Sequence, residues 1–203
     1  VVAYARSPGK LAIRHERLAV AGELSDAASI DRAVAGTDAV VSLLGPLPGA
    51  KGLAITEGTR HVLDAMAEHG VRRLVAVSTA SARDPEDGRD WKFALLVGIM
   101  KRIFPAAYAD IVAAAEAVRG SDREWTIVRL PFLTDGSKTA VAAGPLGRGI
   151  VGTLLSRANL VDFLFHQLRD RRWLRGAPAI SNGRRKDGAP AREPSVDGRR
   201  RSS

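Results

Sequence analysis

Residues 71–80 read VRRLVAVSTA, and this stretch decides the fold class. Four apolar residues in succession, Leu74 to Val77, indicate a strand that is buried on both faces, as in a parallel sheet covered by helices. The preceding residues 54–69 predict a helix with an inward apolar stripe, and Gly70 is a typical stop signal for it. A buried strand that follows a helix in this way predicts a βαβ unit.

The same alternation of strand and helix recurs on both sides of this stretch. Further strands are predicted at residues 1–5, 18–21, 39–44 and 125–129. Further helices are predicted from an N-cap at Ser25 to a stop at Gly36, over 91–104, over 107–119 after a break at Pro105, and from an N-cap at Ser156 to about Leu168. The sequence therefore predicts an α/β protein with a Rossmann-like, doubly wound parallel sheet.

Composition restricts the chemistry. The 203 residues are 45% hydrophobic, which suits one domain, predicted here over residues 1–182. No cysteine is present, which excludes disulfides and thiolate ligands, and the four scattered histidines predict no metal site. The longest apolar run, residues 93–100, is far shorter than a bilayer span. We therefore expect a soluble cytoplasmic protein with no membrane partner.

The net charge of +9 is concentrated in part at the end of the chain. Residues 183–203 hold seven Arg or Lys against three Asp or Glu and are rich in Pro, Gly and Ser. Such a segment cannot offset its ordering entropy, so a disordered basic tail is predicted. Contact of this tail with polyanions is the alternative; no specific nucleic-acid binding is expected.

In a parallel sheet, functional residues follow the strands. Arg6 with Lys10 follows the first strand, where proteins specific for a 2′-phosphate keep a cation; a solvated surface arginine is the alternative. Gly45 and Pro46 could approach a flat ligand or form a simple turn. The hydroxyls of Ser78 and Thr79 could reach a carboxamide or a carbonyl, or cap the next turn. The other positions of this kind are Ser7, Glu23, Leu24, Leu130, Pro131 and Phe132.

Two further groups in the sequence could carry chemistry. Tyr108 has Val112 four residues later, so the Tyr-x-x-x-Lys pair that activates a catalytic tyrosine is incomplete. The loop with Asp84, Glu86, Asp87 and Asp90 is acidic but has no evident partner, and the sequence predicts a solvated surface there.

Eight stretches, in this order and spacing, resemble a known family: ARSPGKL (5–11), AGELSD (21–26), GTDAVVSLLGP (36–46), TEGTRHV (56–62), VRRLVAVSTA (71–80), WTIVRLP (125–131), LTDG (133–136) and SRANLVDFL (156–164). The chain resembles an atypical short-chain dehydrogenase/reductase, NAD(P)H-binding and NmrA-like, close to the biliverdin-IXβ/flavin reductase group. The resemblance extends from Val1 to about Asn182.

The resemblance implies roles for the residues that follow the strands, and NADP(H) rather than NAD(H) as cofactor. It implies that Arg6 and Lys10 meet the 2′-phosphate and that Glu23 with Leu24 borders the adenine, and Ser7 is counted with them among the cofactor-binding residues. It further implies that Leu44, Gly45 and Pro46 line the dinucleotide. The nicotinamide and substrate pocket would be formed by Ser78, Thr79, Leu130, Pro131 and Phe132.

The chain departs from the family at its start, because Val1 matches the family's second strand. The first strand, the glycine-rich loop and the first helix are therefore expected to be lacking, and with them the main anion site for the cofactor. The lacking strand would lie between residues 1–5 and 39–44, so two inner sheet edges should lack a partner. A second departure is that relatives carry histidines at positions matching Phe132 and Ile111.

These observations predict an NADPH-dependent oxidoreductase that passes hydride to a small planar or carbonyl substrate held over Thr79 and Phe132. Thr79, Tyr108 or water would supply the proton. The alternative is a non-catalytic NmrA-like regulator or pseudoenzyme that senses the dinucleotide. Either protein would be a monomer or a homodimer.

Overall fold

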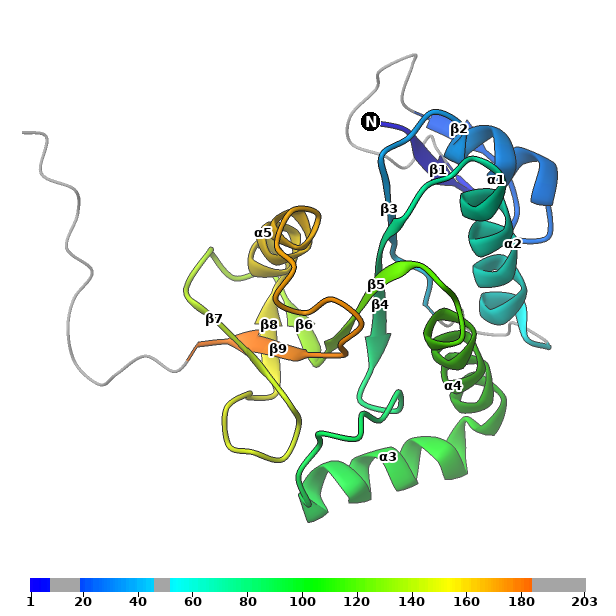
Figure 1. Cartoon of the computed structure of the whole chain (residues 1–203). Helices are drawn as coiled ribbons and strands as arrows, with labels where there is room; N and C mark the ends of the chain where they lie inside the picture. Colours follow the sequence, from blue (N-terminus) through cyan, green and yellow to red (C-terminus); the bar gives the residue numbers. More distant parts are fainter. Residues whose placement is uncertain (8–18, 46–51, 184–203) are drawn as a thin grey trace, which may run out of the picture.

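A central sheet of five strands organises the molecule (Figure 1). The computed structural model describes residues 1–7, 19–45 and 52–183. In spatial order the strands are β3 (Ala39–Ser42), β4 (Arg73–Thr79), β5 (Glu124–Leu130), β9 (Ala179–Asn182) and β7 (Val141–Gly144). The first four are parallel and β7 is antiparallel to β9. The predicted α/β class with a mostly parallel, Rossmann-like sheet is confirmed.

Helices cover both faces of this sheet, which explains the unbroken apolar run in β4. Leu74 packs in the cluster formed with α1 (Ala27–Val34), α2 (Ala54–Glu68) and α4 (Pro105–Arg119). Its neighbour Val75 packs in the opposite cluster, with α5 (Arg157–Gln167). Ile127 and Val128 divide in the same way on β5. Each such side chain contributes about 1.5–3 kcal/mol by leaving water, so both faces of the two strands stabilise the fold.

The sheet is interrupted at the edge of β3. Strands β1 (Ala3–Ala5) and β2 (Ala19–Ala21) form a separate parallel pair, and within the described residues β1 pairs with β2 only and β3 with β4 only. The expected break between these two strands is therefore present. The β1–β2 pair is held to the rest by contacts with α1, and Tyr4 of β1 packs against the cluster around Leu74.

Several predicted boundaries are wrong by a few residues. Asp26, not Ser25, is the N-cap of α1, because its carboxylate accepts a hydrogen bond from the N–H of Ser29 at 3.0 Å. Strand β3 ends at Ser42 instead of Leu44. Helix α4 begins at Pro105 instead of Ala107, since proline fits the first turn of a helix, where its missing N–H would have no partner. The N-cap at Ser156 is confirmed.

Four short strands were not predicted. Two of them, β7 and β9, belong to the central sheet. The other two, β6 (Phe132–Thr134) and β8 (Leu154–Ser156), form a separate parallel pair. These strands are three or four residues long, too short for a period of two to be recognised. In the described ranges no helix combines the length and the apolar character needed to cross a membrane. Those ranges also hold no cluster of three His, Asp or Glu side chains that could ligate a metal.

Candidate active site

Two adjoining cavities lie where β3, β4 and β5 end. The small cavity, about 250 Å³, lies between β3, β4, α2 and α4. The large cavity, about 790 Å³, lies between the ends of β4 and β5 and helix α3 (Trp91–Ile103), which crosses beyond the end of β4 (Figure 1). The two share Thr79, Ile111 and Leu130 in their walls. The two cavities are therefore neighbours, with Thr79 in the wall of both.

The structure brings eight of the residues predicted from sequence to these two cavities. The small cavity is lined by Leu44, Gly45, Ser78, Thr79 and Leu130; the large cavity is lined by Thr79, Tyr108, Leu130, Pro131 and Phe132. Their convergence follows from topology, because the carboxyl ends of parallel strands meet at one edge of a sheet. Ile111, on α4, adds an apolar wall to both cavities.

The hydroxyl of Thr79 can both cap a turn and contact a bound ligand. Its Oγ1 accepts a hydrogen bond from the N–H of Ser81 at 3.2 Å, so it does cap the turn after β4. A hydroxyl that accepts one bond still has its own proton to donate. Thr79 is half-buried and lines both cavities, so that proton can be directed to a bound group. The turn-capping and the ligand-binding interpretations are compatible.

Tyr108 has a cationic neighbour that sequence reasoning missed. The Nζ of Lys101 lies over the Tyr108 ring, 5.5 Å from its centroid, within the range of a cation–π contact. Lys101 belongs to the last turn of α3, and the corner at Phe104–Pro105 brings it back over α4. No fixed spacing in the sequence signals this pair, because the angle between the two helices sets it.

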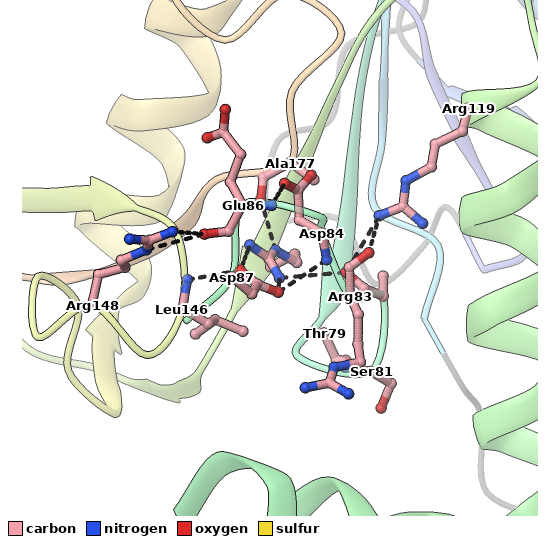
Figure 2. A network of polar contacts seen from close by, with 12 residues as sticks. Thr79, Ser81, Arg83, Asp84, Glu86, Asp87, Arg119, Leu146, Arg148 and Ala177 are labelled. Atoms are coloured by element: carbon pink, nitrogen blue, oxygen red, sulfur yellow. Dashed lines mark hydrogen bonds and ion pairs between the residues drawn. The ribbon is translucent and has the colours of Figure 1, made fainter. Parts of the chain in front are cut away.

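A buried ion pair fixes the loop between β4 and α3. Arg129, which is 1% exposed, donates from Nη1 and Nη2 to the Asp87 carboxylate at 2.6 and 2.7 Å, and from Nε to the carbonyl of Ala177 at 2.7 Å. The N–H of Leu146 donates to the same carboxylate at 2.9 Å, and Figure 2 shows this network. The prediction of a solvated acidic loop is wrong at Asp87, because a strand residue distant in sequence supplies its partner.

Burial alone would raise the pKa of the Asp87 carboxyl, but its hydrogen bonds act in the other direction. Those from Arg129, and from the N–H groups of Asp84 and Leu146, outweigh burial and hold the pKa below its ordinary value. Asp87 is therefore ionised wherever the protein is folded near neutral pH. Arg129 itself lines the large cavity, so this ion pair stiffens part of the cavity wall.

A second buried carboxylate joins the two helices that wall the small cavity. Asp110 of α4 accepts hydrogen bonds from the backbone N–H groups of Ile55 and Thr56, at 2.9 and 2.8 Å, and from the Thr56 hydroxyl at 2.7 Å. The N-cap residue of α2, Leu53, offers no side-chain acceptor, so Asp110 caps α2 from another helix. Helices α2 and α4 are thereby held at a fixed separation.

The residues predicted for the far end of a dinucleotide lie on the β1–β2 pair. Arg6 and Ser7 follow β1 and are exposed. The carbonyl of Glu23 accepts a hydrogen bond from the Tyr4 hydroxyl at 2.7 Å. The carbonyl of Leu24 is 2.9 Å from Nδ1 of His61 on α2. A Cβ at Gly58 would lie 3.0 Å from the Leu24 side chain, so glycine permits this approach. The predicted Lys10 and Pro46 lie outside the described residues.

Comparison with known proteins assigns the family. Residues 1–171 match the sequence family described as NAD(P)H-binding. A short-chain dehydrogenase/reductase from Veillonella parvula, solved in complex with NADP, superimposes with a TM-score of 0.68 at 20% identity, over 88% of this chain and 81% of that one.

Two other solved structures are similar. An oxidoreductase from Lactococcus lactis gives a TM-score of 0.67 at 17% identity, over 89% of this chain and 78% of that one. ChuY, an anaerobillin reductase from Escherichia coli, gives 0.62 at 19% identity, over 85% and 77%. These likenesses show a common fold. From the match over residues 1–171, the chain belongs to the NAD(P)H-binding family.

Proposed function

We propose that this protein binds NADP(H) in the small cavity and along the strand ends, and reduces a small planar or carbonyl substrate in the large cavity. The observation that carries the proposal is the junction of the two cavities at Thr79. A cofactor in one cavity and a substrate in the other would meet at this residue. A volume of about 790 Å³ is in the range of small-molecule sites, and mostly apolar side chains line it.

The order of the strand ends supports the direction of the cofactor. Arg6, with Ser7 and Lys10, would bind the 2′-phosphate; Glu23 and Leu24 would border the adenine; Leu44, Gly45 and Pro46 would line the middle. Ser78 and Thr79 would then reach the nicotinamide, with Leu130, Pro131 and Phe132 beyond it. An arginine at the end of β1 favours a phosphate over a free hydroxyl, which is the basis for preferring NADP(H) over NAD(H).

The residues present fit the two ends of such a cofactor better than its centre. In the described ranges, the first turns of α1, α2 and α5 already have carboxylate or hydroxyl partners, from Asp26, Asp110 and Ser156. Those N–H groups are therefore not free for a pyrophosphate. Contacts at Arg6 and at Thr79 would have to supply most of the affinity.

When bound, NADPH supplies a hydride to the substrate. The chain's own contribution is positioning and proton supply. Phe132, which is 62% exposed at the cavity, offers a flat apolar surface for a planar substrate. The Tyr108 hydroxyl is the candidate proton donor, and Lys101 over its ring favours negative charge developing there. Helix α4 begins at this cavity without a side-chain cap, so its dipole also favours negative charge on a substrate oxygen.

A sensor that binds the dinucleotide without turnover is the second candidate. The observation that favours it is Val112 at the position where a Tyr-x-x-x-Lys pair would have its lysine. In a sensor the large cavity would bind a regulatory ligand or partner instead of a reducible substrate.

The first experiment is calorimetric titration of the full chain with NADPH and with NADH. We expect tighter binding of NADPH, and Arg6→Ala should weaken NADPH binding about tenfold or more and leave NADH unchanged. Arg169→Ala, an exposed arginine distant from the strand ends, is the matched control and should change neither. Absence of binding by both nucleotides would refute the proposal.

A second measurement separates the enzyme from the sensor. NADPH oxidation is followed after addition of a flavin or a quinone. Turnover that Tyr108→Phe lowers supports the reductase, whereas tight NADPH binding with no oxidation of either acceptor supports the sensor.

A further inference from the structure

Helix α3 exposes a continuous row of large apolar side chains. Trp91, Leu95, Ile99 and Ile103 recur every four residues, so they lie on one side of the helix, here called the outer face. Together with Met100 and Phe104 they are between 41% and 72% exposed. Soluble proteins seldom leave a contiguous apolar patch of this kind open to water without a use for it.

The opposite side of α3 is apolar as well. Phe93, Leu96 and Val97 are half-buried and line the large cavity. A helix that is apolar all round is normally buried all round. In this fold the inner side of α3 covers the cavity, while Leu95, Ile99 and Ile103 on the outer face are 56%, 45% and 60% exposed.

The outer face is continuous with the mouth of the large cavity. Met100, Ile103 and Phe104 line the cavity and are also 41%, 60% and 53% exposed. Phe132 also lines this cavity and is 62% exposed. Whatever covers the outer face of α3 therefore lies at the entrance to this cavity.

Charge distinguishes the possible occupants. Helix α3 contains Lys92, Lys101 and Arg102 and no acidic residue. A helix with Trp, Leu and Ile on one side and only cations among its charges suits the surface of an anionic bilayer. Packing of α3 against a second copy would gain no charge complementarity within the helices themselves, because α3 contributes cations and no carboxylate.

We propose that the outer face of α3 docks on an anionic lipid surface, which turns the mouth of the large cavity toward the lipid. The expectation of no membrane partner rested on the length of the longest apolar run, and run length tests only whether a helix crosses a bilayer. Docking on a surface needs one exposed apolar face. The proposal does not depend on the dinucleotide.

The test is co-sedimentation of the full chain, without nucleotide, with vesicles. One set is phosphatidylcholine alone and the other is equal parts phosphatidylcholine and phosphatidylglycerol. We expect binding to the anionic vesicles, weakened by salt, and little binding to the neutral ones. The double variant Leu95→Gln, Ile99→Gln should bind at least about tenfold more weakly, because two large apolar side chains no longer enter the lipid.

Two control variants make the result specific. Val161→Gln, Phe165→Gln removes an exposed apolar pair with the same spacing from α5, with 54% and 64% exposure, and should bind as the unmodified chain does. A variant with Arg199, Arg200 and Arg201 all changed to Gln removes cations near the end of the chain and should also bind normally. Circular dichroism checks that each variant folds. The outer-face positions are exposed, so we expect each variant to unfold at nearly the same urea concentration as the unmodified chain.

Three outcomes would overturn the proposal. The first is no binding to anionic vesicles. The second is binding that survives the Leu95, Ile99 change but is lost in the arginine variant, which assigns it to the end of the chain. The third is a dimer in sedimentation velocity that the Leu95, Ile99 change dissociates, together with no vesicle binding, which assigns the outer face to a second copy. None of these outcomes bears on NADPH binding, so the proposed function is tested separately.

Discussion

Arg129 and Asp87 form a buried two-point ion pair, with a guanidinium that is 1% exposed and a carboxylate that is 8% exposed. Arg129 is on the central strand β5 and Asp87 is in the loop that leads to α3. The pair therefore connects the sheet to the wall of the large cavity. Removing one partner would leave the other charged and buried.

Asp87→Asn should accordingly destabilise the protein by about 3–5 kcal/mol, because it leaves the Arg129 guanidinium without a countercharge. Urea denaturation followed by circular dichroism measures the loss. The control is Glu86→Gln in the same loop, whose side chain is exposed, with an expected change below about 0.5 kcal/mol. Equal effects of the two changes would mean that the ion pair contributes nothing.

The lowered pKa of Asp87 predicts how stability depends on pH. In the unfolded chain this carboxyl titrates near its ordinary value of about 3.9, so its contribution is fully present above that pH. It is lost as pH falls through the lower pKa of the folded state. The free energy of unfolding should therefore fall less steeply below about pH 4 in Asp87→Asn than in the unmodified chain. Parallel curves of unfolding free energy against pH for the two proteins would contradict this prediction. Surface carboxylates are the same in both proteins, so their contribution cancels in the comparison.

Asp110→Ala should loosen the contact between α2 and α4. It leaves the N–H groups of Ile55 and Thr56 without their acceptor, at a cost of about 1–3 kcal/mol for each buried group. Asp110→Asn keeps one acceptor oxygen and should cost less. Glu116→Gln, an exposed carboxylate on the same helix, is the control. Chemical denaturation ranks the three variants, and NADPH affinity should fall with Asp110→Ala because these helices wall the small cavity.

Lys101→Gln should lower kcat about two- to fivefold, as expected for a cation–π contact of about 0.5–1 kcal/mol, and leave the Kd for NADPH unchanged. Tyr108→Phe should lower kcat more, by about a hundredfold or greater if its hydroxyl donates the proton. Arg102→Gln removes the neighbouring cation, which is exposed, and is the matched control for charge alone. Identical effects of the Lys101 and Arg102 changes would refute a specific role for Lys101.

The parts of the fold that sequence predicts are those in which neighbouring residues decide the structure. Leu74 and Val75 occupy opposite faces of β4, and only a strand covered on both sides suits such a run. Ser156 caps α5 through the residue three positions later, a local contact with a recognisable signature. The convergence of Gly45, Thr79 and Phe132 follows from the strand order once the sheet is assumed parallel.

The parts that sequence did not predict depend on distant residues. Asp87 meets Arg129 forty-two positions away, and nothing next to either residue marks the pairing. Lys101 meets Tyr108 because of the angle at the α3–α4 corner. The short strands β7 and β9 pair through backbone hydrogen bonds, and their small side chains give almost no periodic signal. Asp110 caps α2 at a helix start whose own N-cap position gives no sign of an external acceptor.

The break between β1 and β3 divides the proposed cofactor site into two units that belong to different sheets. The unit with Arg6 would hold the adenosine 2′-phosphate half, and the unit with Thr79 would hold the nicotinamide half. No sheet hydrogen bonds in the described ranges join the two strands across this break. The intact dinucleotide would then link the two units. Once one half of it is bound, the effective concentration of the other half at its own unit depends on how firmly the contact of Leu24 with α2 holds the two units together. Tightening that contact would strengthen NADPH binding without adding a single contact to the nucleotide.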